Sequence, residues 1–271
     1  MEDDRTAPLR VGVIGHGAIG ARVAGALAAG EVPGAVLAGV LVRGCRPVPA
    51  RVRDLAALTA AADLVVEAAG QDALREHGPA VLAAGRDLLA VSVGALADDD
   101  LAKALDHAGP GTLLLSQGAL GGLDVVRAAA RSGPLANVTL TSTKRSASLV
   151  QPWMDAGLAG RLTDATPGDA PVTVFDGPAR EAAVRFPRNA NVAATLALAA
   201  GDWDRVRVRL VADPGTPLTR HVVEFAAPAG AYRFDLGNLP DPDNPATSGL
   251  VGHAVLRAVA DRVPASGWRF V

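Results

Sequence analysis

The stretch Leu9-Arg10-Val11-Gly12-Val13-Ile14-Gly15-His16-Gly17-Ala18-Ile19-Gly20 decides the fold of this chain. Its apolar part suits a strand buried on both faces, and the residues after Gly20 favour a helix. Strand, glycine turn and helix in this order are typical of a dinucleotide site. Gly15 permits the tight turn, Gly17 lets the backbone approach a pyrophosphate, and Gly20 lets the helix pack on the strand. We predict that Gly15, His16, Gly17, Ala18, Ile19 and Gly20 bind a dinucleotide; the alternative is a glycine-rich turn that binds nothing.

The next hundred residues continue the pattern that this stretch starts. Further strands are predicted over 35–42, 63–67, 87–91 and 112–115, and helices over 54–61, 72–84 and 98–108. Such alternation predicts a parallel sheet wound in both directions from the first strand, as in the Rossmann fold. The small residues Ala68 and Ala69 follow the third strand, at the edge where a cofactor would bind. We predict a dinucleotide-binding domain over residues 1–120, with residues 246–271 packing back on it.

The pattern changes near residue 120, and we predict a second domain of α+β type, with a mostly antiparallel sheet, over residues 121–245. Strands are predicted over 138–143, 205–211, 221–225 and 232–236, helices over 123–131, 179–184 and 191–199, and a final helix over 248–263. Arg205, Arg207 and Arg209 alternate with apolar residues, which indicates a sheet with one exposed face. The segment 150–178 is rich in Pro, Gly and Asp and is predicted to be a loop.

Composition limits the function classes. The 271 residues are 49% hydrophobic but only 3% aromatic, and the net charge of −2 argues against a nucleic-acid surface. No apolar run reaches the length of a membrane span, and the acidic start does not suit a signal peptide. The single Cys45 cannot form an internal disulfide, so we expect a cytoplasmic protein. Its position after the second strand does not suit a nucleophile. The histidines lack metal-binding spacing, and no metal site is expected.

Four stretches together resemble the L-aspartate dehydrogenase family: Ser92-Val93-Gly94-Ala95-Leu96, Gly118-Ala119-Leu120-Gly121-Gly122-Leu123-Asp124, Phe186-Pro187-Arg188-Asn189-Ala190-Asn191-Val192-Ala193-Ala194 and Asn244-Pro245-Ala246-Thr247-Ser248. Ala212-Asp213-Pro214 and His221 lie between the last two. The resemblance implies a two-domain enzyme, usually a homodimer. Such an enzyme oxidises L-aspartate with NAD or NADP to iminoaspartate, which is released or hydrolysed to oxaloacetate and ammonia. By position, His221 matches the catalytic histidine, and Asn191 and Ala119 match cofactor contacts.

The chemistry of amine oxidation suits a histidine, because the substrate amine must lose a proton before a hydride can leave. Without the resemblance, His221 fits better as a strand-end histidine bound to backbone groups. A dicarboxylate amino acid also requires cationic partners, for which Lys144, Arg145 and Arg188 are candidates. The chain departs from the family pattern at Gln117, Thr219, Ala246 and in Lys144-Arg145-Ser146, where the family commonly has Arg-Lys-Pro. These departures concern the substrate contacts more than the cofactor.

Cofactor preference is predicted from the end of the second strand. NAD-specific sites carry an acidic residue there, whereas this chain has Val42-Arg43-Gly44-Cys45-Arg46. Glu31 comes too early and Asp54 too late, so no carboxylate is expected to repel a 2′-phosphate. Arg43, with Arg46, could bind that phosphate, or both could lie in solvent. We expect NADP(H) to be accepted at least as well as NAD(H). Two other functions stay open: a dehydrogenase or reductase for another amino or imino acid, and a non-catalytic dinucleotide-binding regulator.

Overall fold

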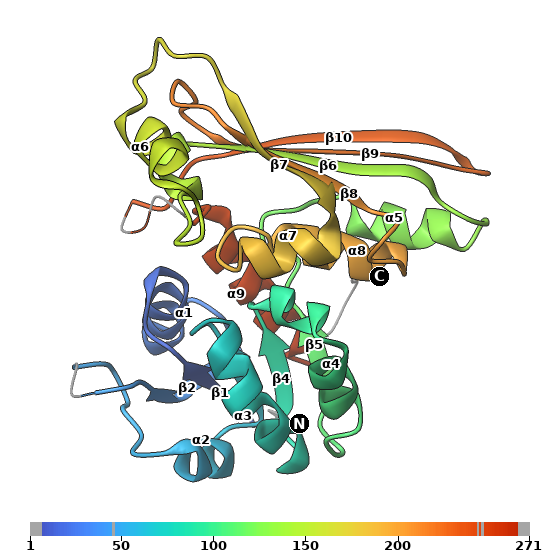
Figure 1. Cartoon of the computed structure of the whole chain (residues 1–271). Coiled ribbons are helices and arrows are strands. Elements are labelled where there is room, and N and C mark those ends of the chain that lie inside the picture. Colours follow the sequence, from blue (N-terminus) through green and yellow to red (C-terminus); the bar gives the residue numbers. More distant parts are fainter. Residues whose placement is uncertain (1–6, 45–46, 243, 245–246, 265–271) are drawn as a thin grey trace. The chain divides into compact units, whose positions relative to one another are not determined.

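The computed structural model describes residues 7–44, 47–242, 244 and 247–264, which form two compact units (Figure 1). The first unit comprises the described residues within Met1–Ser92, Lys103–Ser116 and Gly252–Val271. The second comprises those within Val93–Ala102 and Gln117–Val251. Each unit has its own five-stranded sheet. Cys45, Arg46 and Ala246 lie outside the described residues, so the expectations for them have no structural counterpart.

The first unit is built on a parallel sheet in the strand order β2-β1-β3-β4-β5. Its strands are β1 (Leu9–Ile14), β2 (Ala35–Leu41), β3 (Leu64–Glu67), β4 (Asp87–Ala90) and β5 (Leu113–Leu115). Every residue of β3 is buried, as expected for a parallel strand covered on both faces. The order runs outward in both directions from β1, which confirms the predicted Rossmann-type sheet.

Helices cover both faces of this sheet, and two neighbouring residues of β1 show it. A Cβ on Gly12 would lie 2.8 Å from the Leu58 side chain of α2, whereas Val13 lies near Gly20 at the start of α1. Because successive strand residues point to opposite faces, α1 and α2 pack on opposite sides. The helices of this unit are α1 (Ala18–Ala28), α2 (Leu55–Ala61) and α3 (Gln71–Ala83), with α4 (Asp99–Asp106) and α9 (Leu250–Arg262) crossing the division between the units.

The described residues from Gly252 onward belong to the first unit. A Cβ on Gly34 would lie 2.5 Å from the Val263 side chain, and Arg262 forms an ion pair with Asp87 at the start of β4. The segment after Gly252 therefore adds a helix to the dinucleotide-binding fold rather than extending the second sheet.

The second unit has a mixed sheet in the order β10-β9-β6-β8-β7. Neighbouring strands are antiparallel except β6 and β8, which are parallel, so the predicted mostly antiparallel sheet is confirmed. The strands are β6 (Ala136–Lys144), β7 (Val172–Pro178), β8 (Arg207–Ala212), β9 (Thr219–Ala227) and β10 (Gly230–Asn238). The helices are η1 (Val93–Ala97, 3₁₀), α5 (Leu123–Ala130), η2 (Ser146–Leu149, 3₁₀), α6 (Ala156–Asp164), α7 (Ala179–Arg185) and α8 (Asn191–Ala200).

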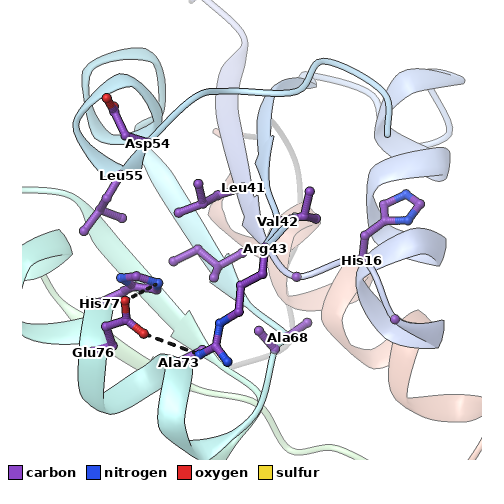
Figure 2. Close-up of a pocket in the computed structure, with 14 residues that line it drawn as sticks. His16, Leu41, Val42, Arg43, Asp54, Leu55, Ala68, Ala73, Glu76 and His77 are labelled. Atoms are coloured by element: carbon purple, nitrogen blue, oxygen red, sulfur yellow. Dashed lines mark hydrogen bonds and ion pairs between the residues drawn. The ribbon is translucent and has the colours of Figure 1, made fainter. Parts of the chain in front are cut away.

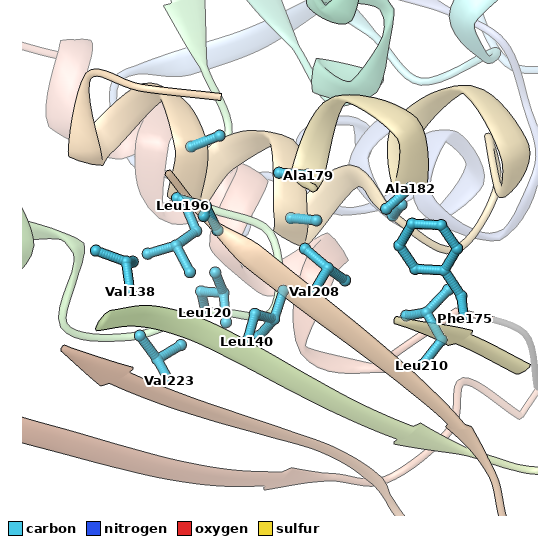
Figure 3. Packing of buried hydrophobic residues seen from close by; sticks show 14 of the residues in the cluster. Leu120, Val138, Leu140, Phe175, Ala179, Ala182, Leu196, Val208, Leu210 and Val223 are labelled. Atoms are coloured by element: carbon cyan, nitrogen blue, oxygen red, sulfur yellow. The ribbon is translucent and has the colours of Figure 1, made fainter. Parts of the chain in front are cut away.

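One face of the second sheet is packed, and the other carries charges. Figure 3 shows Ala179, Ala182 and Leu196 of α7 and α8 against Leu140 and Val208 of the strands, within a buried apolar core. Ion pairs follow the opposite face, among them the pairs Arg220–Asp235 and Arg207–Asp176. Arg207 and Arg209 alternate with buried residues as predicted, whereas Arg205 precedes β8.

The predicted loop over 150–178 is wrong in part, because it contains α6 and β7. The Asp155 carboxylate caps α6 by accepting the Leu158 N–H at 2.9 Å. Strand β7 ends at Pro178 and lies at the edge of the sheet, where a residue without an N–H is tolerated. Its glycine and proline content reflects an edge position and not the absence of a strand.

Candidate functional site

The glycine turn opens a cleft in the first unit with a volume of about 580 Å³, a size typical of ligand sites. Among the predicted cofactor residues, Gly15, His16, Gly17, Arg43, Ala68 and Ala69 line it. Figure 2 shows His16, Arg43 and Ala68, which follow β1, β2 and β3, around this cleft. Ala18, Ile19 and Gly20 form the first turn of α1 beside the cleft. The carboxyl ends of the parallel strands thus meet where the sequence placed the dinucleotide.

Glycine suits each of the three positions of the turn for a different geometric reason. Gly15 has a φ of +94°, and a Cβ there would lie 2.8 Å from the Ala68 carbonyl oxygen. A Cβ on Gly20 would lie 2.3 Å from the Gly15 carbonyl oxygen, so α1 approaches the turn as closely as backbone allows. At Gly17, the N-cap of α1, a Cβ would meet nothing within 4 Å. No side chain caps the helix there, so its N-terminal N–H groups are left for a phosphate.

A buried carboxylate holds the neighbouring loop. Glu67 at the end of β3 is 1% exposed, and its Oε1 accepts the N–H groups of Ala69 at 2.7 Å and Gly70 at 2.9 Å. Its two oxygens also accept the Ser92 hydroxyl and N–H, each at 3.1 Å. Burial raises the pKa of Glu67, while these hydrogen bonds oppose the rise. Glu67 thereby fixes the Ala68–Gly70 loop against the glycine turn.

The expectation that no carboxylate lies near a 2′-phosphate is wrong. Glu76 of α3 and Asp54 both line the cleft with Arg43, and a Glu76 oxygen lies 3.4 Å from the Arg43 guanidinium (Figure 2). The end of β2 carries no carboxylate, but α3 brings Glu76 to the same place. The Arg43 and Glu76 side chains are 79% and 59% exposed, so this ion pair is weak and open to competition from a ligand.

A second group of functional side chains lies in the second unit, at one end of its sheet. On the packed face, β6 carries Ser142 and Lys144, and the neighbouring β9 carries Thr219 and His221. Ser142 pairs with His221 in register, and all four residues are buried. On β10, Asn238 pairs with Thr219. We call Ser142, Lys144, Thr219, His221 and Asn238 the polar end of the second sheet.

His221 is held by a hydrogen bond to a serine. The Ser142 Oγ lies 2.8 Å from the His221 Nδ1, and both residues are at most 1% exposed. Burial, with a smaller contribution from the charge of Lys144, lowers the pKa of His221 to about 3. The imidazole is therefore neutral at physiological pH, and it does not titrate near the usual value of about 6.5.

Lys144 is a buried cation without a counterion among the described residues. It is 7% exposed, and burial lowers the pKa of its ammonium group to about 8. No described carboxylate lies within ion-pair distance of Lys144. Buried charges normally have a partner, so this position suits an anionic ligand or a group that changes protonation near neutral pH.

The other predicted site residues of the second unit differ in whether they lie near the buried cluster. The Ala119 carbonyl accepts the Asn238 side-chain N–H at 3.3 Å, which places Ala119 beside the polar end of the second sheet. Asn191 begins α8, and its Oδ1 accepts the Gly94 N–H at 3.0 Å. Arg145 and Arg188 are exposed, whereas their neighbours Lys144 and Asn189 are buried. Of the three predicted substrate cations, only Lys144 lies in the buried cluster.

The residues at these sites that the sequence did not indicate include Ser142, Glu67, Glu76 and Asn238. Ser142 had a usable signal, because it shares the period-two face of Val138 and Leu140 and is polar where an apolar residue is expected. Glu67 and Glu76 had none, because only the pairing of strands and the packing of α3 bring them to the cleft. Among the described residues, no three or more His, Cys, Asp or Glu side chains cluster as metal ligands do, and no helix is both long and apolar enough to cross a bilayer.

Comparisons with known proteins give matches in both units of the chain. Residues 15–110 match a family model described as the NAD binding domain of homoserine dehydrogenase. An L-aspartate dehydrogenase 2 from Bordetella pertussis is 51% identical over 87 residues, which cover 32% of this chain and 33% of that protein. The L-aspartate dehydrogenase of Methanopyrus kandleri is 42% identical over 86 residues. These alignments span about a third of the length of the curated relatives.

A solved structure shares the fold along nearly the whole chain. The aspartate dehydrogenase of Thermotoga maritima superposes with a TM-score of 0.71 over 96% of this chain and 99% of that chain, at 24% identity. Residues 124–262, just over half of the chain, match the model described as aspartate dehydrogenase, C-terminal. On this evidence, the chain belongs to the aspartate dehydrogenase family.

Proposed function

We propose that this protein is an NAD(P)-dependent L-aspartate dehydrogenase, which converts L-aspartate to iminoaspartate, or oxaloacetate and ammonia, or runs the reverse reductive amination. The family membership and the named relatives support this proposal. Buried Lys144 beside neutral His221 is the observation that carries it, because a dicarboxylate amino acid supplies the anion that Lys144 lacks.

The glycine cleft fits a dinucleotide cofactor. The space over Gly17 is open, the N-terminus of α1 has no side-chain cap, and the buried His16 Nδ1 has no hydrogen-bond partner among the described residues. Gly17 and the first turn of α1 would hold the pyrophosphate, and Ala68 and Ala69 would contact the cofactor from β3. When bound, the cofactor accepts or donates the hydride. Ala119 and Asn191 are proposed as further contacts by their position in the family pattern.

The polar end of the second sheet is proposed to bind the substrate. Lys144, which is a cation below its pKa of about 8 and an amine above it, can attract an anionic substrate or exchange a proton with it. A neutral His221 can exchange a hydrogen bond with the substrate amine or a carboxylate without adding charge. Exposed Arg145 and Arg188 are weaker candidates, because solvent screens their charges.

The test is a spectrophotometric assay at 340 nm. Formation of NADH and NADPH is followed with L-aspartate, and their consumption with ammonium and a panel of 2-oxo acids that includes oxaloacetate. The proposal expects the highest kcat/KM with L-aspartate and oxaloacetate. A higher value with another acid identifies a related dehydrogenase or reductase. Turnover of none, together with cofactor binding, identifies a dinucleotide-binding regulator.

The assembly and location are proposed from the family resemblance and the composition. We propose a homodimer in the cytoplasm, with a small-molecule substrate and no nucleic-acid partner. Light scattering after size-exclusion chromatography measures the assembly directly, and a monomeric mass contradicts the dimer.

A further inference from the structure

The hydrogen bond between Ser142 and His221 restricts which imidazole nitrogen carries a proton. Ser142 is fully buried in the central strand β6, and its hydroxyl has one described partner, the His221 Nδ1 at 2.8 Å. If Nδ1 carried the hydrogen, the serine proton would be buried without an acceptor, which costs about 1–3 kcal/mol. With the hydroxyl donating to Nδ1, both groups are satisfied. The neutral imidazole therefore carries its hydrogen on Nε2.

This tautomer changes what His221 can do. An Nε2–H group donates a hydrogen bond, but it has no lone pair with which to accept a proton. Nδ1 is occupied by Ser142, so a second nitrogen is not available. A substrate ammonium must nevertheless lose a proton before its Cα–H bond can release a hydride. Another group of the polar end of the second sheet has to accept that proton.

Lys144 is the remaining titratable group there. It lies two residues from Ser142 on the same buried face of β6 and close enough to His221 for its charge to affect that ring. Burial lowers the pKa of Lys144 to about 8, so a large fraction is a neutral amine in mildly alkaline solution. Lysines act as general bases when burial brings them into this range.

We propose that Lys144 accepts the proton of the substrate ammonium and that His221 serves as a hydrogen-bond donor through Nε2. This inference rests on the proposed function. In the oxidative direction the neutral Lys144 amine takes one proton and becomes an ammonium. The substrate Cα–H bond then breaks, and its hydride passes to NAD(P)⁺, so the amino acid is oxidised to an iminium while the cofactor is reduced. Lys144 returns its proton to solvent before the next turnover.

The charges around Lys144 are consistent with this role. His221 faces it from β9 and stays neutral over the range in which Lys144 titrates. Asp213 follows β8, where its N–H binds the Lys144 carbonyl, but its Oδ1 accepts the Gly215 N–H at 2.9 Å. Arg145, which directly follows β6, is exposed. Burial is the one cause acting on the pKa of Lys144, with no described carboxylate holding the ammonium in its charged form.

The first arm of the test separates a base from a carboxylate anchor. The pH dependence of kcat/KM for L-aspartate oxidation is measured from pH 6 to 10 in the native protein, Lys144→Arg, Lys144→Met and His221→Gln. Arg keeps the positive charge but cannot release a proton. The proposal expects a rise with an apparent pKa near 8 in the native protein and in His221→Gln. Lys144→Arg should lose this rise and about 100-fold or more in kcat, with KM changed by less than about fivefold.

The second arm observes His221 without turnover. Two-bond ¹H–¹⁵N correlation spectra of ¹⁵N-histidine protein, from pH 5.5 to 9, should show the Nε2–H tautomer throughout. The His221 resonance is identified by its loss in His221→Gln, and Ser142→Ala should release the tautomer preference. A His221 ring that is protonated on Nδ1, or that titrates within this range, overturns the assignment.

The outcomes of these experiments distinguish a failure of the base role from a failure of the proposed function on which it rests. A native protein that oxidises L-aspartate, with a Lys144→Arg variant equally active and equally pH-dependent, overturns the base role alone. A native protein inactive on L-aspartate overturns the proposed function and the base role together. The tautomer of His221 is then still decided by the spectra.

Discussion

The glycine cleft of the first unit and the polar end of the second sheet are built in opposite ways. The cleft is formed by backbone and small residues, and a Cβ on Gly20 would already lie 2.3 Å from the neighbouring carbonyl oxygen. The polar end of the second sheet is formed by long, titratable side chains that the sheet buries, with His221 at 1% and Lys144 at 7% exposure. Backbone geometry shapes one site, and burial sets the chemistry of the other.

Because of this difference, the two sites should be sensitive to different kinds of substitution. A cleft that binds through N–H groups and shape is affected by added volume and hardly by pH. A site made of a buried lysine and histidine costs stability, since burial disfavours the charged forms, and it should respond to pH and to charge substitution. The substitutions below should therefore affect cofactor affinity or turnover, but not both.

The largest effect is expected at the polar end of the second sheet. His221→Ala removes the donor and leaves the Ser142 hydroxyl without its acceptor. We expect kcat to fall by about 10²–10³-fold, the usual effect of removing one positioned hydrogen-bond donor. Cofactor affinity, measured by quenching of protein fluorescence, should change less than about twofold, because the first unit is untouched. If His221→Ala keeps more than half of the native activity, His221 is not part of the catalytic site.

In the glycine cleft, Gly20→Ala should weaken cofactor binding by about 100-fold, equivalent to about 2.7 kcal/mol. The added methyl would displace the Gly15 turn, with which it overlaps. Gly25→Ala in the same helix is the matched control, because a Cβ there meets nothing within 4 Å. This control should leave affinity unchanged and stabilise the protein by about 0.5–1 kcal/mol. Equal affinities for the two variants, in titrations followed by calorimetry, contradict the close approach of α1.

Arg43 and Glu76 form the charged part of the cleft, and the preference between NADP(H) and NAD(H) tests their roles. Arg43→Asp should lower kcat/KM for NADP(H) by about ten- to a hundredfold, because a charged hydrogen bond contributes roughly 1.5–3 kcal/mol. Glu76→Gln should raise the affinity for NADP(H) by up to about fivefold, since an exposed ion pair of roughly 0.2–1 kcal/mol no longer competes for Arg43.

NAD(H) binding provides the control for both variants and should change little in Glu76→Gln. A native preference for NAD(H) of tenfold or more in kcat/KM shows that Glu76 and not Arg43 dominates the site.

The last expected effect is a change in stability and not in binding. Lys144→Met removes a buried, unpartnered charge and should raise the free energy of unfolding at pH 7 by about 1–3 kcal/mol, a few degrees in Tm. Because the pKa of Lys144 falls from 10.5 when unfolded to about 8 when folded, the native protein gains stability as pH rises through this window. The advantage of the variant should shrink toward pH 10.5. Thermal unfolding between pH 6 and 10 measures it, and a constant difference argues against a perturbed lysine.

The order of the residues is enough to predict the Rossmann-type sheet, the glycine turn and the family, because these depend on local patterns. The positive φ of Gly15 and the approach of Gly20 to the Gly15 carbonyl oxygen belong to the turn itself, and a strand followed by a helix is visible in the order of the chain. His221 and Lys144 were identified as candidates from their place in a family pattern, without any indication of their protonation.

The chemistry of those candidates depends on contacts that form only when the chain folds. Ser142 and His221 are 79 residues apart in the chain and meet through the pairing of β6 with β9, which fixes the tautomer. Glu76 reaches Arg43 across 33 residues through the packing of α3, a contact that the residues at the end of β2 do not reveal. A pKa depends on what surrounds a group in space. The buried lysine and the neutral histidine follow from folding, and the residue order alone does not contain them.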